Sequence, residues 1–81
     1  MITCRIFTPE GTSEVLETEL VTFDAPDARR GIVSGHMPIV VSVEKGHLWT
    51  LLDGKRDCYE MGEGILYFKD NVATFLVSSF N

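Results

Sequence analysis

The stretch "HLWTLLDGKRDCYEM", residues 47–61, decides the fold class of this chain. Two strand-like runs in it flank Asp53-Gly54. Both residues of that pair accept the positive φ angles of a type I′ turn, and Asp-Gly between two such runs is the strongest short signal for a β-hairpin. We therefore predict that residues 47–52 and 55–61 are strands joined by a two-residue turn.

Similar short runs lie on both sides of this hairpin. Alternation in "ITCRIFT" (residues 2–8) predicts a strand, and "TSEVLETELVTFDA" (residues 12–25) is expected to hold two more. The run "IVVSV" (residues 39–43) is typical of a buried β-branched strand. Between them, "PDARRG" (residues 26–31) is predicted to be a loop because Pro and Gly mark turns.

A second hairpin is predicted at Asp70-Asn71, between "ILYFK" and "VATFLVSSF". No stretch has convincing helical periodicity. Short strands at intervals of roughly 8 to 12 residues indicate an all-β sandwich or barrel. We predict one domain over residues 1–81, a small β-sandwich or flattened barrel of short, mostly antiparallel strands.

The candidate core consists of apolar side chains on these predicted strands. Period-two alternation places alternate residues on one face of a strand, and aromatic residues on strands pack most often in the core. The residues expected in the core are Ile2, Cys4, Ile6, Val15, Leu20, Val21, Phe23, Trp49, Tyr67, Phe68 and Phe75.

Charge and composition exclude several classes of protein. The formal net charge is −5, with no basic stripe of the kind that nucleic-acid binders carry. No apolar run is long enough to span a bilayer, and the start lacks a secretory signal pattern. We therefore expect the protein in the cytoplasm or on a cytoplasmic face, where Cys4 and Cys58 would be buried thiols.

The stretch "GIVSGHMPIV" (residues 31–40) is the candidate functional motif. It lacks the Lys and hydroxyl that follow the second glycine of a phosphate loop, and no βαβ unit surrounds it. The cysteines and histidines are too widely spaced to predict zinc, and Cys58 lies mid-strand rather than in an elbow that would activate it. Asp24 and Asp27 are expected to be solvated.

A structural role for this stretch remains. Gly31 and Gly35 allow positive φ or close backbone approach, and Pro38 holds Met37 extended. His36 can hydrogen-bond to its own backbone and fix the shape of the turn. Loops on a rigid β scaffold often carry binding function, so we predict a rigid binding loop.

The chain resembles the N-terminal β-sandwich domain of the epsilon subunit of F-type ATP synthases. The resemblance rests on residues 31–38, on "TPEG" (8–11), "KGHLW" (45–49), "GEGIL" (62–66) and "DNVATFL" (70–76), which occur in the family's order. The sequence departs from the family at Ser34, where proline is usual, and at Arg29-Arg30, where an acidic or glycine residue is usual. The family's two-helix C-terminal domain is not represented in these residues.

The resemblance implies a non-catalytic rotor subunit at the foot of the central stalk, on the cytoplasmic face of a bacterial plasma membrane. Its partners would be the gamma subunit and the polar loops of the c-ring, and it would help couple proton or sodium transport to ATP synthesis. It implies no catalytic residue, metal or cofactor. ATP binding is not expected either, because in the family the nucleotide contacts lie on the C-terminal helices. The residues that the resemblance places in a c-ring docking loop are Arg29, Arg30, Gly31, Ser34, Gly35, His36, Met37 and Pro38.

Two other functions fit the residues. One is a free-standing β-sandwich adaptor that binds another protein or a small ligand. The other is a small enzyme that depends on Cys58 or His36.

Overall fold

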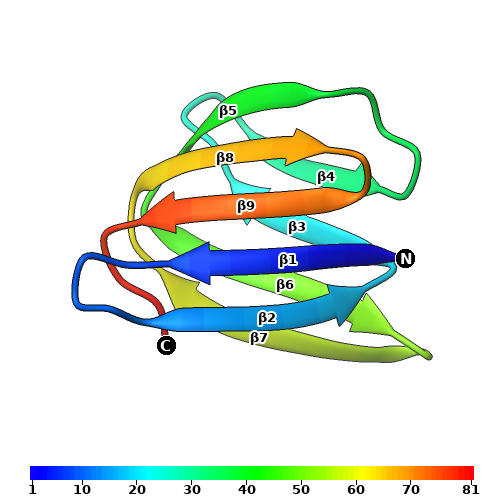
Figure 1. Cartoon of the computed structure of the whole chain (residues 1–81), viewed down its shortest axis with the longest axis horizontal. Coiled ribbons are helices and arrows are strands. Elements are labelled where there is room, and N and C mark those ends of the chain that lie inside the picture. The colour runs from blue at the N-terminus through cyan, green and yellow to red at the C-terminus, as the bar shows by residue number, and fades with distance from the viewer.

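Nine strands form two sheets that pack face to face in the computed structural model, which describes residues 1–81 (Figure 1). The structure contains no helix, which confirms the predicted all-β class. The strands are β1 (Ile2–Phe7), β2 (Ser13–Thr18), β3 (Leu20–Asp24), β4 (Arg29–Val33), β5 (Ile39–Val43), β6 (Gly46–Leu52), β7 (Lys55–Met61), β8 (Gly64–Lys69) and β9 (Val72–Val77).

The two sheets differ in size and in strand order. One has five strands in the order β2-β1-β9-β8-β5, and the other has four in the order β4-β3-β6-β7. Every strand pair is antiparallel except β1 with β9, which run parallel in the middle of the larger sheet. The prediction of short, mostly antiparallel strands is therefore confirmed.

Both predicted two-residue hairpins are present. Asp53 and Gly54 have φ angles of 51° and 78°, and Leu52 pairs with Lys55 across the turn. Asp70 and Asn71 have φ angles of 52° and 61°. Positive φ at both central residues is the signature of a type I′ turn, whose twist matches that of the flanking strands.

The core lies between the two sheets. On β1 the alternation has the predicted sense, since Ile2, Cys4 and Ile6 are fully buried. The rings of Phe23 and Phe75 meet edge to face across the sandwich, with centroids 5.7 Å apart. The apolar cluster comprises Ile2, Cys4, Ile6, Val21, Phe23, Ala25, Ile32, Val43, Leu48, Met61, Leu66, Phe68, Ala73, Phe75 and Val77.

Some core predictions are wrong, because side chains on the outward side of a strand cannot reach the core. Val15 is 63 % exposed and Tyr67 is 46 % exposed, while Leu20 and Trp49 are half-buried. Of the run 39–43, only Val43 is buried, since β5 is an edge strand with one neighbour.

Two further expectations need correction. Residues 29–31 belong to strand β4 and not to a loop, because they pair with β3 in the ladder Asp24–Arg29, Phe23–Arg30 and Thr22–Gly31. The cysteines also differ from one another. Cys4 is buried, and this burial, with a smaller contribution from Glu17, raises the pKa of its thiol to about 12. Cys58 is exposed on β7 instead of buried.

Candidate functional site

The predicted docking residues lie on a segment, residues 29–38, that covers one side of the sandwich. The segment starts as β4, the edge strand of the four-stranded sheet. It then crosses in the 34–38 loop to β5, the edge strand of the five-stranded sheet (Figure 1). Its residues are exposed apart from His36, which is half-buried, and Ile32, which is buried. The segment is therefore an accessible side of the molecule.

The structure does not bring the two parts of this segment together. Arg29 and Arg30 begin β4, whereas Ser34 to Pro38 follow its end. A five-residue strand is about 16 Å long. The arginine pair and the loop around His36 therefore lie at opposite ends of the sandwich. They can act on one partner only if that partner contacts the whole side.

The 34–38 loop is the shaped turn that its residues predict. Gly35 has a φ of +86°, and the Nδ1–H of His36 donates to the carbonyl of Met37 at 2.7 Å. The His36 ring also packs edge-on against Phe68, with centroids 5.9 Å apart. Gly31 does not need to be glycine, because it lies in β4 and an added Cβ would come no closer than 3.5 Å to Leu20.

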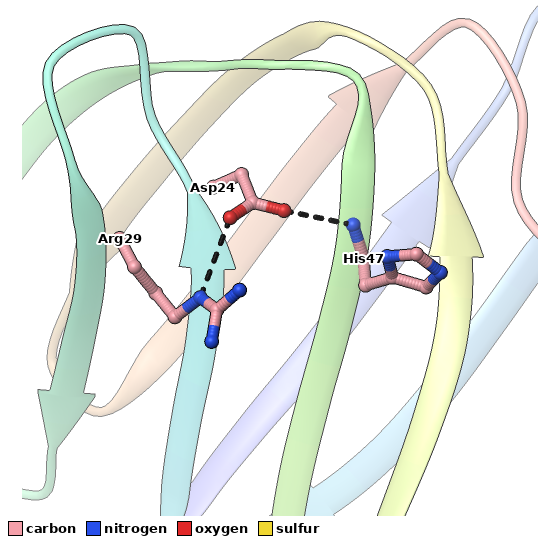
Figure 2. A network of polar contacts seen from close by, with 3 residues as sticks. All are labelled: Asp24, Arg29 and His47. Carbon is pink, nitrogen blue, oxygen red and sulfur yellow. Dashed lines mark hydrogen bonds and ion pairs between the residues drawn. The ribbon is translucent and has the colours of Figure 1, made fainter.

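Arg29 belongs to a network that ties β3, β4 and β6 together (Figure 2). Its Nε lies 3.4 Å from Asp24 Oδ1, and the other oxygen of that carboxylate accepts the backbone N–H of His47 at 3.1 Å. The Arg29 guanidinium also lies over the Trp49 ring, 4.1 Å from its centroid. Asp24 is thus a structural partner and not a solvated acid. No local sequence signal marks this network, because His47 lies 23 positions from Asp24 in the chain.

Arg30 is held much less firmly. Its nearest partner is Asp27, three residues away, with 3.4 Å between Nη2 and Oδ2. Both side chains are well exposed, at 43 % and 67 %. Exposed pairs of this kind contribute little to stability. Arg30 is therefore the arginine that remains available to a partner.

We expect the two arginines to differ in their effect on folding. Arg29→Ala should lower the free energy of unfolding by about 1 kcal/mol, since it removes a cation–π contact and a charged partner of Asp24. Arg30→Ala should change it by less than about 0.5 kcal/mol. Urea unfolding measures both, and Trp49, the only tryptophan, should change its emission only in the Arg29 variant. Equal effects of the two substitutions would contradict the assignment.

A second candidate surface is the outward side of the five-stranded sheet, which the sequence patterns did not reveal. Large apolar side chains from β2, β5, β8 and β9 are exposed there. Tyr67 is a cross-strand neighbour of Val40, and Ile65 is a neighbour of Leu76. We call this surface the outer apolar face; its residues are Val15 (63 % exposed), Val40 (63 %), Ile65 (45 %), Tyr67 (46 %) and Leu76 (54 %).

A shallow groove of about 320 Å³ adjoins this face at the end of β9. Phe7, Pro9 and Leu76 line its apolar part, and Glu63 and Ser78 line its polar part. The Ser78 hydroxyl donates to Glu63 at 3.1 Å. A backbone hydrogen bond and this hydroxyl lower the pKa of the Glu63 carboxyl. The rim of the groove carries this negative charge at neutral pH, as it would at the ordinary pKa of a glutamate. An apolar floor with a charged rim suits a protein partner.

The structure brings together no set of three His, Cys, Asp or Glu side chains that could hold a metal ion. The thiol of Cys4 stays protonated at neutral pH, and Cys58 lies across the ladder from Trp49. No helix is long and apolar enough to cross a membrane. The exposed surfaces that offer candidate binding residues are the 29–38 side and the outer apolar face.

Comparison with known proteins agrees with this architecture. The family model for the β-sandwich domain of the ATP synthase delta/epsilon chain matches residues 1–81. The ATP synthase epsilon chains of Desulfitobacterium hafniense strains DSM 10664 / DCB-2 and Y51 are each 29 % identical over 77 residues. Those matches cover 95 % of this chain and 58 % of each relative. The chain therefore spans a little over half the length of the curated relatives it matches.

Solved structures with the same fold come from ATP synthase complexes. One is a chain of the Euglena gracilis mitochondrial ATP synthase, in the OSCP/F1/c-ring structure, with a TM-score of 0.85 and 19 % identity. Another is from the central stalk/c-ring structure of the Tetrahymena thermophila mitochondrial ATP synthase, with a TM-score of 0.77 and 13 % identity. Both alignments cover 99 % of this chain, and they cover 52 % and 65 % of those chains. These structures share the fold of this chain. The match of the family model to residues 1–81 shows that this chain belongs to the ATP synthase delta/epsilon family, as its β-sandwich domain.

Proposed function

We propose that this protein is a non-catalytic rotor subunit in the central stalk of an F-type ATP synthase. In this role it links the gamma subunit to the c-ring and helps couple proton or sodium transport to ATP synthesis. It works as a peripheral part of the complex, on the cytoplasmic face of a bacterial plasma membrane. The observation that carries the proposal is the outer apolar face, an exposed surface on a chain that belongs to this family.

The gamma subunit is the partner that we assign to the outer apolar face. Four exposed apolar side chains of this face lie next to one another on three neighbouring strands, namely Val40, Tyr67, Ile65 and Leu76. Such a group on a protein surface marks an interaction site. Tyr67 offers an anchor of the kind that dominates binding energy at the centre of an interface, and Leu76 adds apolar contact area. The adjoining groove beside Phe7 and Pro9 can receive a further apolar side chain of the partner.

The 29–38 side is assigned to the polar loops of the c-ring. Its exposed residues include Arg30 and the Gly35–Pro38 turn, and they lie along one edge of the sandwich. The net charge of the chain is −5, but Arg30 is a local positive charge on this side. It favours contact with a partner loop that is negatively charged. The start of β4 and the 34–38 loop occupy opposite ends of this side. Both can contact the ring only if the whole side faces it.

The test combines the purified chain with isolated gamma and with detergent-solubilised c-rings. We expect a stable complex with gamma and, through it, association with the ring. Arg30→Glu should weaken c-ring association by about threefold or more at low ionic strength, because a rim charge acts mainly on the encounter rate. The same substitution should leave gamma binding and the thermal midpoint unchanged.

Lys55→Glu is the matched control, since it makes the same charge change at the β6–β7 turn, where Lys55 is 78 % exposed. An equal loss in both variants would mean that only net charge matters and would remove the docking role of Arg30. Failure to bind gamma at all would refute the proposed function.

A further inference from the structure

We propose that Asn71, in the β8–β9 turn, is a positioning residue that holds the 34–38 loop in its docking shape. The backbone N–H of Gly35 donates to Asn71 Oδ1 at 2.8 Å. The two residues lie 36 positions apart in the chain. The β8–β9 turn and the β4–β5 loop occupy the same end of the sandwich (Figure 1). The proposal rests on the proposed docking role of the 29–38 side.

The Asn71 side chain supplies what the loop cannot supply for itself. Gly35 is exposed and has a φ of +86°, a conformation that glycine adopts freely but does not hold by itself. The bond from His36 Nδ1–H to Met37 shapes the turn after Gly35, and the His36 ring lies against Phe68 on β8. The side-chain oxygen of Asn71, Oδ1, fixes Gly35, the residue before His36. Both attachments anchor the loop to the β8–β9 hairpin.

Asn71 itself is fixed independently of the loop. Its φ of 61° places it at the second central position of the turn, and its backbone carbonyl accepts the N–H of Thr3 at 3.0 Å. The turn therefore presents the side-chain amide from a rigid hairpin that is also tied to β1. Because the hairpin is rigid, the hydrogen bond from Gly35 to Asn71 restricts the position of the 34–38 loop. A contact with another mobile loop would not restrict it in this way.

Another turn of this chain shows how the Asn71 side chain can be removed without loss of the hairpin. Asn71→Gly converts the turn to Asp-Gly, the pair that already forms the β6–β7 turn at Asp53-Gly54. Gly favours positive φ, so the hairpin should persist while the acceptor for Gly35 is lost. Asn71→Asp keeps an oxygen acceptor and tolerates positive φ, so it should restore the bond. Asp70→Gly changes the neighbouring turn residue and leaves Asn71 in place.

Amide hydrogen exchange by NMR on the isolated chain tests the bond directly. In Asn71→Gly, the Gly35 amide should exchange roughly fivefold faster, while the Thr3 amide should keep its protection. Asn71→Asp and Asp70→Gly should both behave as the parent chain does at Gly35. Unchanged Gly35 exchange in Asn71→Gly would overturn the proposal, and so would faster exchange of Thr3 and Gly35 together, because that would show general loosening of the hairpin.

Association with c-rings supplies the functional readout. Asn71→Gly, which leaves the charge of this side unchanged, should weaken it by about threefold or more, while gamma binding stays constant. If Gly35 exchange responds as expected but c-ring association does not, the positioning role of Asn71 stands, and the assignment of the 34–38 loop to the c-ring is what fails.

Discussion

Gly64→Ala is expected to lower the free energy of unfolding by about 3 kcal/mol or more, a large fraction of the stability that a domain of this size possesses. A Cβ at Gly64 would meet the carbonyl oxygen of Leu76 and come within 2.8 Å of the Val77 Cα. Both atoms belong to the backbone of β9, which has neighbours on both sides in the five-stranded sheet. Neither of these backbone atoms can move aside without breaking hydrogen bonds between β9 and its neighbours β1 and β8.

Gly31→Ala is the matched control, since Gly31 also lies in a strand. Its added Cβ would make only ordinary contacts, the nearest at 3.5 Å to a Leu20 methyl group, and its φ is not positive. We expect this variant to be within about 0.5 kcal/mol of the parent chain. Urea unfolding followed by far-ultraviolet circular dichroism measures both. Similar urea midpoints for the two variants would contradict the prediction, because they would show that β9 shifts to accommodate the added Cβ at little cost in stability.

The second large effect concerns the outer apolar face. Replacing Ile65 by glutamate and Leu76 by lysine together should weaken gamma binding by about 100-fold, because two apolar side chains of the interface would become charges that must lose their water on binding. The two positions are direct cross-strand neighbours, and both are about half exposed. The new side chains can therefore pair with each other, and the fold should survive.

Val33→Lys is the control for this experiment. Val33 is 54 % exposed, as Leu76 is, but it lies on β4 in the other sheet. This variant should bind gamma as the parent chain does. Titration calorimetry or co-purification with gamma gives the comparison. A folded Ile65→Glu, Leu76→Lys chain that binds gamma within about threefold of the parent would exclude this face as the interface.

Local sequence determined most of the strands and both two-residue turns, but not β4, whose first residues the sequence pattern predicts to be a loop. Asp53-Gly54 and Asp70-Asn71 form tight turns because their preference for positive φ is a property of the dipeptide itself. Alternation in residues 2–8 likewise indicates a strand without knowledge of its neighbours. The shape of the Gly35–Pro38 turn was also predictable, since the bond from His36 to Met37 joins adjacent residues.

Tertiary structure decided which side of each strand is buried and where the candidate site lies. Alternation shows that a strand has two faces, but only packing against the second sheet selects the inner one, so Val15 and Tyr67 face outward and create the outer apolar face. Arg29 and Arg30 look alike in sequence. They differ because β4 pairs with β3, and β3 in turn pairs with β6, which sets Arg29 beside Asp24 and over Trp49. The bond from Gly35 to Asn71 joins residues far apart in the chain, so it exists only once both sheets are assembled.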